Sequence, residues 1–277
     1  MIKSLVLTGF GINCEEAMAA AYRLAGAQAD IVHVNDILRQ GFDIHNYHIL
    51  NFPGGFSFGD DISSGKVLAN KIKYKKLPNG RTFLDEINLF LAQGKYIMGV
   101  CNGFQVLVKL GLLPNVGGRV EQEVSLSRNN SGQYENRWCY LKVNPNSRTP
   151  FLRGMTVFPV PVRHGEGKLI INNAELEQSI IQQALNCLSY CMPDGTPTDQ
   201  YPLNPNGAAL QCAGLISPNG QVFGLMPHPE AFLSLYNHPN WGQLKRQDPH
   251  RSEDGEGLQI FRNIVEHIES LLGVVSA

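Results

Sequence analysis

One cysteine of this sequence stands where a nucleophile could be activated. Cys101 is the centre of a G-x-C-x-G string at 99–103, between an apolar segment at 96–100 and a helix-forming segment at 103–110. In the related G-x-S-x-G elbow, the nucleophile occupies a strained turn between a strand and a helix, and small flanking residues leave space for it. A thiol in this place faces the helix N-terminus, which stabilises the thiolate. A buried cysteine between packing glycines is the alternative, but the strand–helix junction favours a nucleophile.

A histidine and a glutamate near the C-terminal end could activate that thiol. His228 and Glu230 belong to a Pro-His-Pro-Glu string that follows the apolar segment 220–226. The two prolines hold the backbone extended, and residues i and i+2 of an extended chain point the same way. Glu230 can therefore orient the His228 ring, which would take the thiol proton and later deliver it to a leaving amine.

Backbone donors for an oxyanion are expected in two places. Gly55 is the second of two glycines after the apolar segment 48–52, and glycines let backbone N–H groups approach a ligand closely. The N–H groups of Gly55 and Asn102 are the predicted donors to a tetrahedral intermediate. A phosphate loop is disfavoured, because the Walker pattern is absent and Asp60 and Asp61 would repel phosphate.

Alternating strand and helix signals must position these residues. Strands are expected at 3–7, 30–34, 48–52 and 96–100, and helices at 14–25, 63–71, 83–93 and 103–110. Strands that alternate with helices of this length predict βαβ units and a central, mostly parallel sheet flanked by helices.

The second half of the chain has a different pattern of residue types and segment lengths. From about Glu121 the segments are short, rich in β-branched and aromatic residues, and interrupted by Pro, Asn and Gly, which predicts an antiparallel region added to the same domain, 1–277. A strand returns at 220–226, the polar stretch 237–257 is expected to be a surface loop, and apolar spacing over 257–272 predicts an amphipathic helix.

The composition excludes several classes of protein. The 277 residues include 23 basic and 24 acidic ones, so there is no basic excess to bind nucleic acid or a membrane surface. No apolar run reaches the roughly 18–20 residues of a membrane span, and residues 1–7 predict a strand rather than a signal peptide. A cytoplasmic protein is expected.

The cysteines do not follow a ligand or disulfide pattern. The sequence lacks C-x-x-C spacing, which disfavours both a disulfide framework and a zinc site. Free and mostly buried thiols are expected at Cys14, Cys101, Cys139, Cys187, Cys191 and Cys212.

The motifs, taken in order, resemble the class I, triad-type, glutamine amidotransferases. The motif sequences most resemble those of the glutaminase subunits of phosphoribosylformylglycinamidine synthases. The resemblance covers nearly the whole chain. It is carried by segments 8–14, 54–60, 99–105, 161–167, 204–207 and 226–230. Phe58 stands where many members have Tyr, and segments 115–150, 170–200 and 237–257 are longer than in the compact members.

The resemblance implies a flavodoxin-like class I glutamine amidotransferase fold and a reaction. L-Glutamine is hydrolysed to glutamate and ammonia by a triad of Cys101, His228 and Glu230. The residues implied for the glutamine site are Gly54, Gln105, Arg163, His164 and Gly165.

The resemblance also implies a partner. A synthetase subunit, which holds ATP and Mg, would use the ammonia to convert formylglycinamide ribonucleotide to formylglycinamidine ribonucleotide in de novo purine biosynthesis. This subunit would carry no cofactor. The resemblance leaves open whether a small accessory subunit joins the complex. Because the chain starts at Met1 with a strand, a separate subunit is expected rather than the tail of a fused synthase.

Three alternatives remain at this point. A cysteine hydrolase of the protease or deglycase type would have a histidine directly after the elbow cysteine, where this chain has Asn102. A glutaminase that serves another synthetase would differ in the Gly-Gly-Phe-Ser and Asn-Gly-Phe-Gln strings. A scaffold that has lost catalysis would be expected to lack at least one triad residue.

Overall fold

A sheet of nine strands forms the centre of the protein. The computed structural model describes residues 1–60 and 62–273, so Asp61 and the last four residues of the predicted domain 1–277 lie outside the description. The strands in spatial order are β2 (Gln28–His33), β1 (Lys3–Thr8), β3 (Ile49–Phe52), β4 (Tyr96–Val100), β11 (Val222–Leu225), β10 (Cys212–Ile216), β9 (Asn186–Cys191), β6 (Glu135–Val143) and β7 (Val157–His164).

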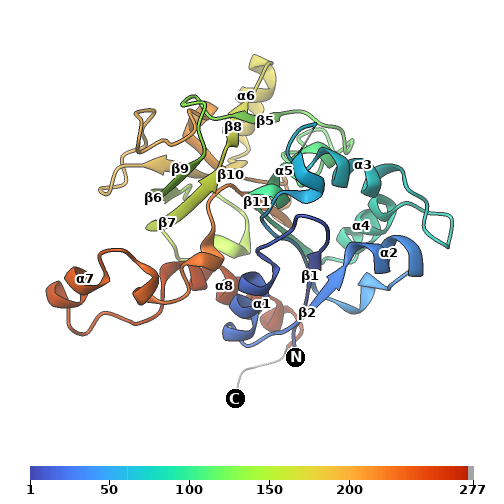
Figure 1. The fold of residues 1–277 in the computed structure, drawn as a ribbon, viewed down its shortest axis with the longest axis horizontal. Coiled ribbons are helices and arrows are strands. Elements are labelled where there is room, and N and C mark those ends of the chain that lie inside the picture. Colours follow the sequence, from blue (N-terminus) through green and yellow to red (C-terminus); the bar gives the residue numbers. More distant parts are fainter. Residues whose placement is uncertain (61, 274–277) are drawn as a thin grey trace.

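The first five of these strands are parallel, and helices connect them on both faces. The connecting helices are α1 (Glu15–Leu24), α2 (Val34–Gln40), α3 (Lys66–Tyr74), α4 (Phe83–Ala92) and α5 (Asn102–Leu110). Because β2 and β3 flank β1 on opposite sides, right-handed crossovers place α1 and α2 on opposite faces. The last helix, α8 (Glu256–Leu271), packs against α1, and α3 packs against α4 and α5 (Figure 1). The predicted α/β class is confirmed.

The added antiparallel region extends this sheet. Strands β10, β9, β6 and β7 pair antiparallel in turn beyond β11. A separate two-stranded sheet joins β5 (Ser125–Arg128) to β8 (Glu166–Ile170), and α6 (Ala174–Gln182) precedes β9. Hydrogen bonds between β10 and β11 therefore join this region to the parallel half. The continuous pairing from β11 to β7 holds the end of β7 in a fixed place relative to β11.

Some elements differ from the sequence expectation. The strand expected at 30–34 ends at His33, whose ring accepts a hydrogen bond from the Asn35 N–H and so caps α2. Helix α3 begins at Lys66 rather than residue 63. The first boundary depends on a capping contact and the second on the left-handed backbone of Gly65, and hydrophobic periodicity encodes neither.

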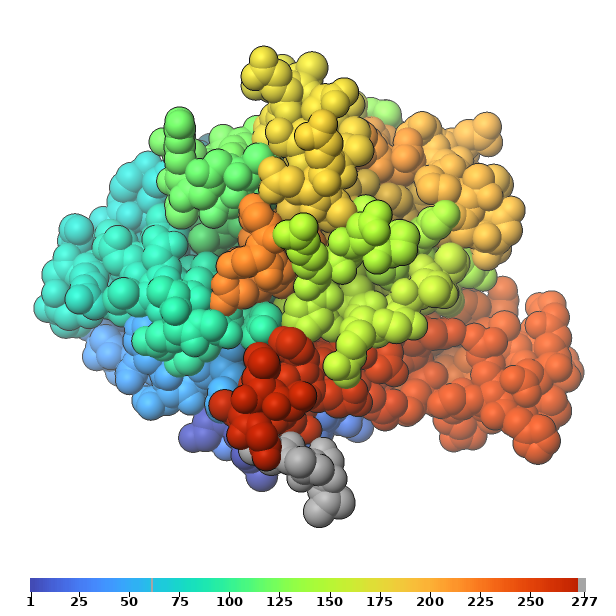
Figure 2. All heavy atoms as spheres, turned by 180° about the vertical axis from the view of Figure 1, so that it is seen from behind, coloured from blue at the N-terminus to red at the C-terminus, as the bar shows by residue number. Residues whose placement is uncertain are grey.

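The stretch 237–257 is not only a loop. It contains α7 (Trp241–Gln247), which has no buried residue and therefore no apolar stripe by which it could be predicted. Figures 1 and 2 both show the orange segment around α7 projecting from the body of the protein. The Trp241 and Tyr236 rings meet edge to face there, with centroids 5.3 Å apart. In the part of the chain described, no helix is both long and apolar enough to cross a membrane.

A buried polar network ties the parallel strands to α1. The Tyr22 hydroxyl donates to Asn51 Oδ1 over 2.7 Å, and the Asn51 amide donates to Ser4 Oγ and to the Leu5 carbonyl. Tyr22, Asn51 and Ser4 are all inaccessible to solvent. Burial raises the pKa of the Tyr22 hydroxyl, so this group stays protonated and remains a donor.

We expect Tyr22→Phe to destabilise the fold by about 1–3 kcal/mol, because the Asn51 carbonyl oxygen then loses its donor inside the core. Urea unfolding followed by circular dichroism measures the change. Tyr74→Phe is the control, since Tyr74 is 67% exposed, and it should change the free energy of unfolding by less than about 0.5 kcal/mol. Equal stability of the two variants would contradict this account of the network.

Candidate active site

Cys101 occupies a strained turn between β4 and α5. Its backbone has φ 51° and ψ −107°, outside the regions that non-glycine residues usually adopt, and it caps the N-terminus of α5. A Cβ on Gly103 would lie 1.8 Å from the Phe52 carbonyl oxygen, and one on Gly99 would lie 2.9 Å from the backbone of Gly103. Both glycines are therefore required for the elbow, as the sequence predicted.

Parallel pairing of β4 with β11 brings the histidine to the cysteine. The register pairs Leu225 with Val100, so both strands end at one edge of the sheet. The Cys101 N–H donates to the Leu225 carbonyl over 2.8 Å, and the His228 N–H donates to the Pro161 carbonyl on β7 over 2.8 Å. His228 is thus held between the parallel and antiparallel halves of the sheet.

The imidazole and the carboxylate form a buried ion pair. His228 Nδ1 lies 2.6 Å from Glu230 Oε1, and each residue is 3% exposed. Burial alone would lower the pKa of His228, but the charges of Glu230 and Cys101 outweigh it and raise the pKa well above its usual value. Among the described residues His228 Nε2 has no hydrogen-bond partner, which leaves that nitrogen available for proton transfer.

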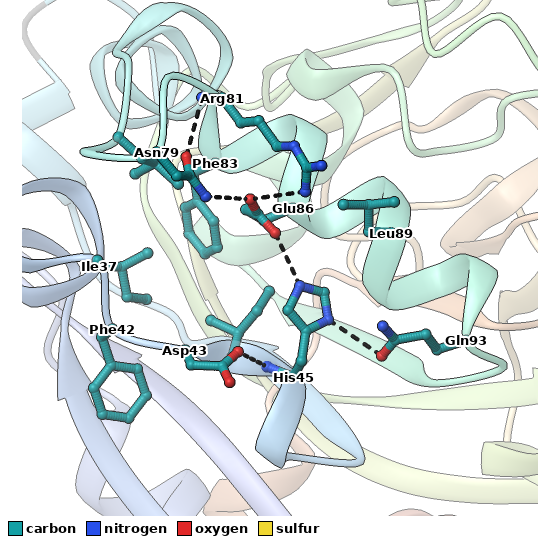
Figure 3. A pocket seen from close by; sticks show the side chains of 13 residues that line it. Ile37, Phe42, Asp43, His45, Asn79, Arg81, Phe83, Glu86, Leu89 and Gln93 are labelled. Carbon is teal, nitrogen blue, oxygen red and sulfur yellow. Dashed lines mark hydrogen bonds and ion pairs between the residues drawn. The ribbon is translucent and has the colours of Figure 1, made fainter.

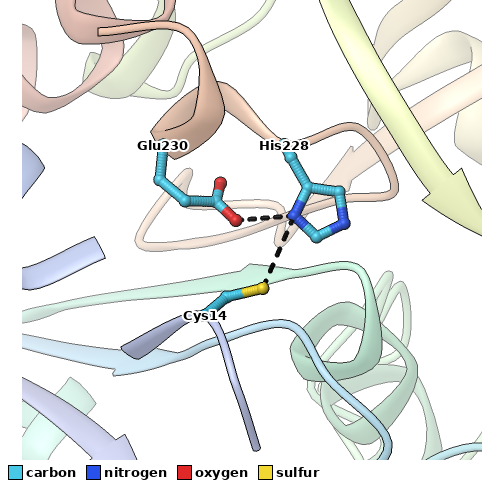
Figure 4. A group of neighbouring side chains, drawn as sticks. All are labelled: Cys14, His228 and Glu230. Atoms are coloured by element: carbon cyan, nitrogen blue, oxygen red, sulfur yellow. Dashed lines mark hydrogen bonds and ion pairs between the residues drawn. The ribbon is translucent and has the colours of Figure 1, made fainter. Parts of the chain in front are cut away.

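A second thiol, which the sequence did not single out, lies beside this pair. Cys14 Sγ is 4.0 Å from His228 Nδ1, so the sulfur and the Glu230 carboxylate converge on the same ring nitrogen (Figure 4). A Cβ on Gly54 would lie 2.7 Å from His228 Cε1, 3.1 Å from Cys14 Sγ and 3.5 Å from Cys101 Cβ. The absence of a side chain at Gly54 is what lets these groups come together.

The Gly54–Gly55 loop is held by the segment after β1. The Phe56 N–H donates to the Gly11 carbonyl over 2.6 Å, and the Asn13 N–H donates to the Gly54 carbonyl over 3.2 Å. These two bonds frame an antiparallel bridge between Ile12 and Gly55, so the Gly55 N–H points away from the partner segment. Gly55 has φ 141°, which favours glycine.

These residues border a pocket of about 300 Å³. Of the residues predicted for the site, Gly55, Cys101, Arg163 and His228 line it. The pocket is completed by residues that were not predicted for the site, namely Asn13, Cys14, Phe56 and Tyr134. The first three belong to the motif segments 8–14 and 54–60, whereas Tyr134 lies outside every motif. Tyr134 lies in the segment 115–150, between β5 and β6, and its ring stands 6.4 Å from that of Phe56.

Other predicted residues lie behind the pocket. The Gln105 amide donates to the Glu166 carbonyl, and the Asn102 side chain accepts from the Ser57 N–H and donates to Gln105. Both Gln105 and Asn102 are buried. These side chains brace the elbow, so a direct contact of Gln105 with glutamine stays a prediction.

His164 is also turned inward. Its Nδ1 meets Asn129 Oδ1 over 3.1 Å, and burial together with the charge of His228 lowers its pKa to about 3, so the ring is neutral. Gly165 follows it, and a Cβ there would lie 3.9 Å from Tyr134 Cδ2. The Arg163 carbonyl, in the same segment, accepts a hydrogen bond from Cys101 Sγ over 3.5 Å.

A second cavity, of about 390 Å³, lies between α2 and α4 (Figure 3). Glu86 is at its centre and is paired with His45 Nε2 over 2.9 Å and with the Asn79 amide over 2.8 Å, while His45 Nδ1 meets Gln93. Its polar groups satisfy one another, and its lining contains no cysteine or other nucleophile with a base. We therefore place the candidate active site at Cys101.

Comparison with known proteins agrees with this geometry. The chain belongs to the CobB/CobQ-like glutamine amidotransferase domain family, and the sequence model of that family matches residues 1–268. It is similar to phosphoribosylformylglycinamidine synthase subunit PurQ of Methanococcus maripaludis, with 41% identity over 96% of this chain and 97% of that protein. The subunit PurQ of Dehalococcoides mccartyi is 38% identical over the same shares of the two chains.

A solved structure supports the same assignment. The structure of PurLQS from Thermotoga maritima contains a chain that matches 96% of this one and 99% of its own length, with TM-score 0.68 and 26% identity. The class I glutamine amidotransferase fold predicted from the motifs is thereby confirmed.

We expect Gly103→Ala to abolish the assembled elbow, because its Cβ would collide with the Phe52 carbonyl and neither backbone can yield without moving β3 from α5. Thermal unfolding should show a loss of about 1–3 kcal/mol, the range of overpacked cores. Gly117→Ala is the control, since a Cβ there would meet nothing closer than 3.8 Å. A Gly103→Ala protein as stable as the control would show that the junction is loosely packed.

Proposed function

We propose that this chain hydrolyses L-glutamine to glutamate and ammonia, with Cys101 as the nucleophile, His228 as the acid and base, and Glu230 as the group that orients the imidazole. The observation that carries the proposal is a single arrangement. A cysteine on a strained elbow, at the mouth of a pocket, lies beside a buried imidazole whose other side is fixed by a carboxylate at 2.6 Å. This is the arrangement that acyl transfer requires.

The chain is a glutamine amidotransferase of the kind that supplies ammonia within phosphoribosylformylglycinamidine synthase, an enzyme of purine biosynthesis. Its partner is a PurL-type synthetase, because PurLQS contains a chain of this fold and length. We propose that ATP and Mg act in that partner, which would convert formylglycinamide ribonucleotide to the amidine. We also propose that glutamine hydrolysis does not require a small accessory subunit, since residues of this chain alone line the pocket.

The chemistry follows from the positions of the groups. The Cys101 thiolate attacks the side-chain carbonyl carbon of glutamine, and the carbonyl electrons move onto oxygen, where the N–H groups of Gly55 and Asn102 would receive them. The protonated His228 gives its proton to the leaving nitrogen, and ammonia departs from a thioester. His228 then takes a proton from water, and the hydroxide formed releases glutamate and regenerates the thiolate.

The pocket also fits the substrate chemistry. Arg163 lines it with an exposed side chain and can pair with the α-carboxylate of glutamine, while Tyr134 and Phe56 flank the entrance. A cysteine hydrolase of the deglycase type would take its base from the residue after the nucleophile. Here that residue, Asn102, is an amide bonded to Ser57 and Gln105 and has no basic function.

Replacing Cys101 with Ala should abolish glutamine-dependent synthesis in the assembled complex and leave ammonia-dependent synthesis intact, because the nucleophile serves only the hydrolysis. A glutamine-mimicking diazo-ketone should label wild-type Cys101 once, as mass spectrometry of peptides would show, and excess glutamine should block the label. Cys191→Ser, a change at a buried cysteine outside the pocket, is the control. Loss of the ammonia-dependent rate as well would mean that Cys101 is structural.

Glu230→Gln should move the alkaline limb of the pH profile of kcat/KM to lower pH. The carboxylate charge holds the pKa of His228 up against burial, so its removal lowers that pKa and the imidazolium is lost earlier as pH rises. The rate at the optimum should fall by about 10²-fold or more. Glu175→Gln on the exposed start of α6 should leave the profile unchanged. An unmoved limb would remove Glu230 from the relay.

A further inference from the structure

Three side chains from two distant parts of the sequence converge beside the nucleophile. Cys14, His228 and Glu230 each present a ligand atom, and these atoms all lie within 4.8 Å of one another (Figure 4). The sulfur is 4.0 Å and the carboxylate oxygen 2.6 Å from His228 Nδ1. The reaction proposed above gives no task to Cys14, so its place in this group calls for another explanation.

The donors match the preferences of Zn²⁺. Zinc binds thiolate, imidazole and carboxylate with tetrahedral geometry, which sets the ligand atoms about 3.3–3.6 Å apart for bonds of ~2.0–2.3 Å. The separations of 2.6 and 4.0 Å from His228 Nδ1 lie on either side of that value, and the third separation, between the sulfur and the carboxylate oxygen, is within 4.8 Å, so binding requires the side chains to shift toward that spacing. Glu230 Oε2 is buried and has no partner among the described residues, which leaves a lone pair for a cation.

The backbone holds the sulfur in this position. The N–H groups of Asn13 and Cys14 both donate to the Gly54 carbonyl, over 3.2 and 3.3 Å, and Cys14 is the N-cap residue of α1. Since Gly54 has no side chain, nothing separates Cys14 from His228. Cys14 and His228 also line the 300 Å³ pocket, so an ion can reach them from solvent.

We propose that Cys14, His228 and Glu230 form an inhibitory zinc site inside the active centre. The ion displaces the proton from His228 Nδ1 and the proton of the Cys14 thiol, and both protons pass to solvent. It also binds the Glu230 carboxylate, which otherwise stabilises the imidazolium. A fourth position faces the pocket and takes water. The consequence for turnover rests on the proposed glutaminase function, whereas the binding itself does not.

Zinc binding can be tested without turnover. The Cys101→Ala protein, which cannot contribute the nucleophile as a ligand, is titrated with Zn²⁺ in competition with a chromogenic chelator. We expect one ion per chain. Adding Cys14→Ser should weaken binding by about 100-fold or more, since loss of even an outer-sphere partner costs 10–100-fold. Adding His250→Ala, at an exposed histidine outside the group, should change nothing, and circular dichroism checks that each variant is folded.

Two results would overturn the proposal. One is equal zinc affinity with and without Cys14→Ser in the Cys101→Ala background, and the other is no stoichiometric binding in that background. Inhibition is measured separately, with each protein compared with its own zinc-free rate of glutamine hydrolysis. Wild type should lose activity at zinc concentrations about 100-fold below those that inhibit Cys14→Ser. If no glutamine hydrolysis is found but zinc binds as expected, only the proposed function fails.

Discussion

The parallel pairing of β4 with β11 is the constraint on which the site depends. The register partners Val100 and Leu225 are 125 positions apart in the sequence, yet the carboxyl ends of the two strands share one edge of the sheet. The hydrogen bond from the Cys101 N–H to the Leu225 carbonyl fixes the turn of the elbow. Without this register, neither the buried imidazole nor its carboxylate would reach the sulfur.

The site also depends on glycines that allow backbone segments to pack closely against one another and against His228. The glycines at 54, 99 and 103 all lie where a Cβ would collide with the His228 side chain or with backbone. The strain of Cys101, at φ 51°, persists because these contacts leave the chain no relaxed alternative. The same packing that holds Cys101 in its strained turn therefore makes the elbow intolerant of added volume.

The added antiparallel strands take part in the site as well as in the fold. Strand β7 supplies the Pro161 carbonyl that holds His228 and the Arg163 carbonyl that faces Cys101. The turn between β5 and β6 carries Tyr134 to the pocket entrance, where it meets Phe56 from the Gly54–Gly55 loop. Residues from both halves of the sheet therefore form the pocket.

The sequence by itself determined the local parts of this protein. The glycines around Cys101, the prolines around His228 and the apolar periods of β1, β3, β4 and α8 act over a few residues, and a single sequence displays them. Only the tertiary structure decided that Cys14 lies beside His228, that Tyr134 borders the pocket, and that Gln105 and His164 face inward. These are contacts between residues far apart in the chain. They depend on strand register and loop packing, which produce no periodic pattern in the sequence. The helix α7 escaped prediction for a related reason, since it buries no apolar face.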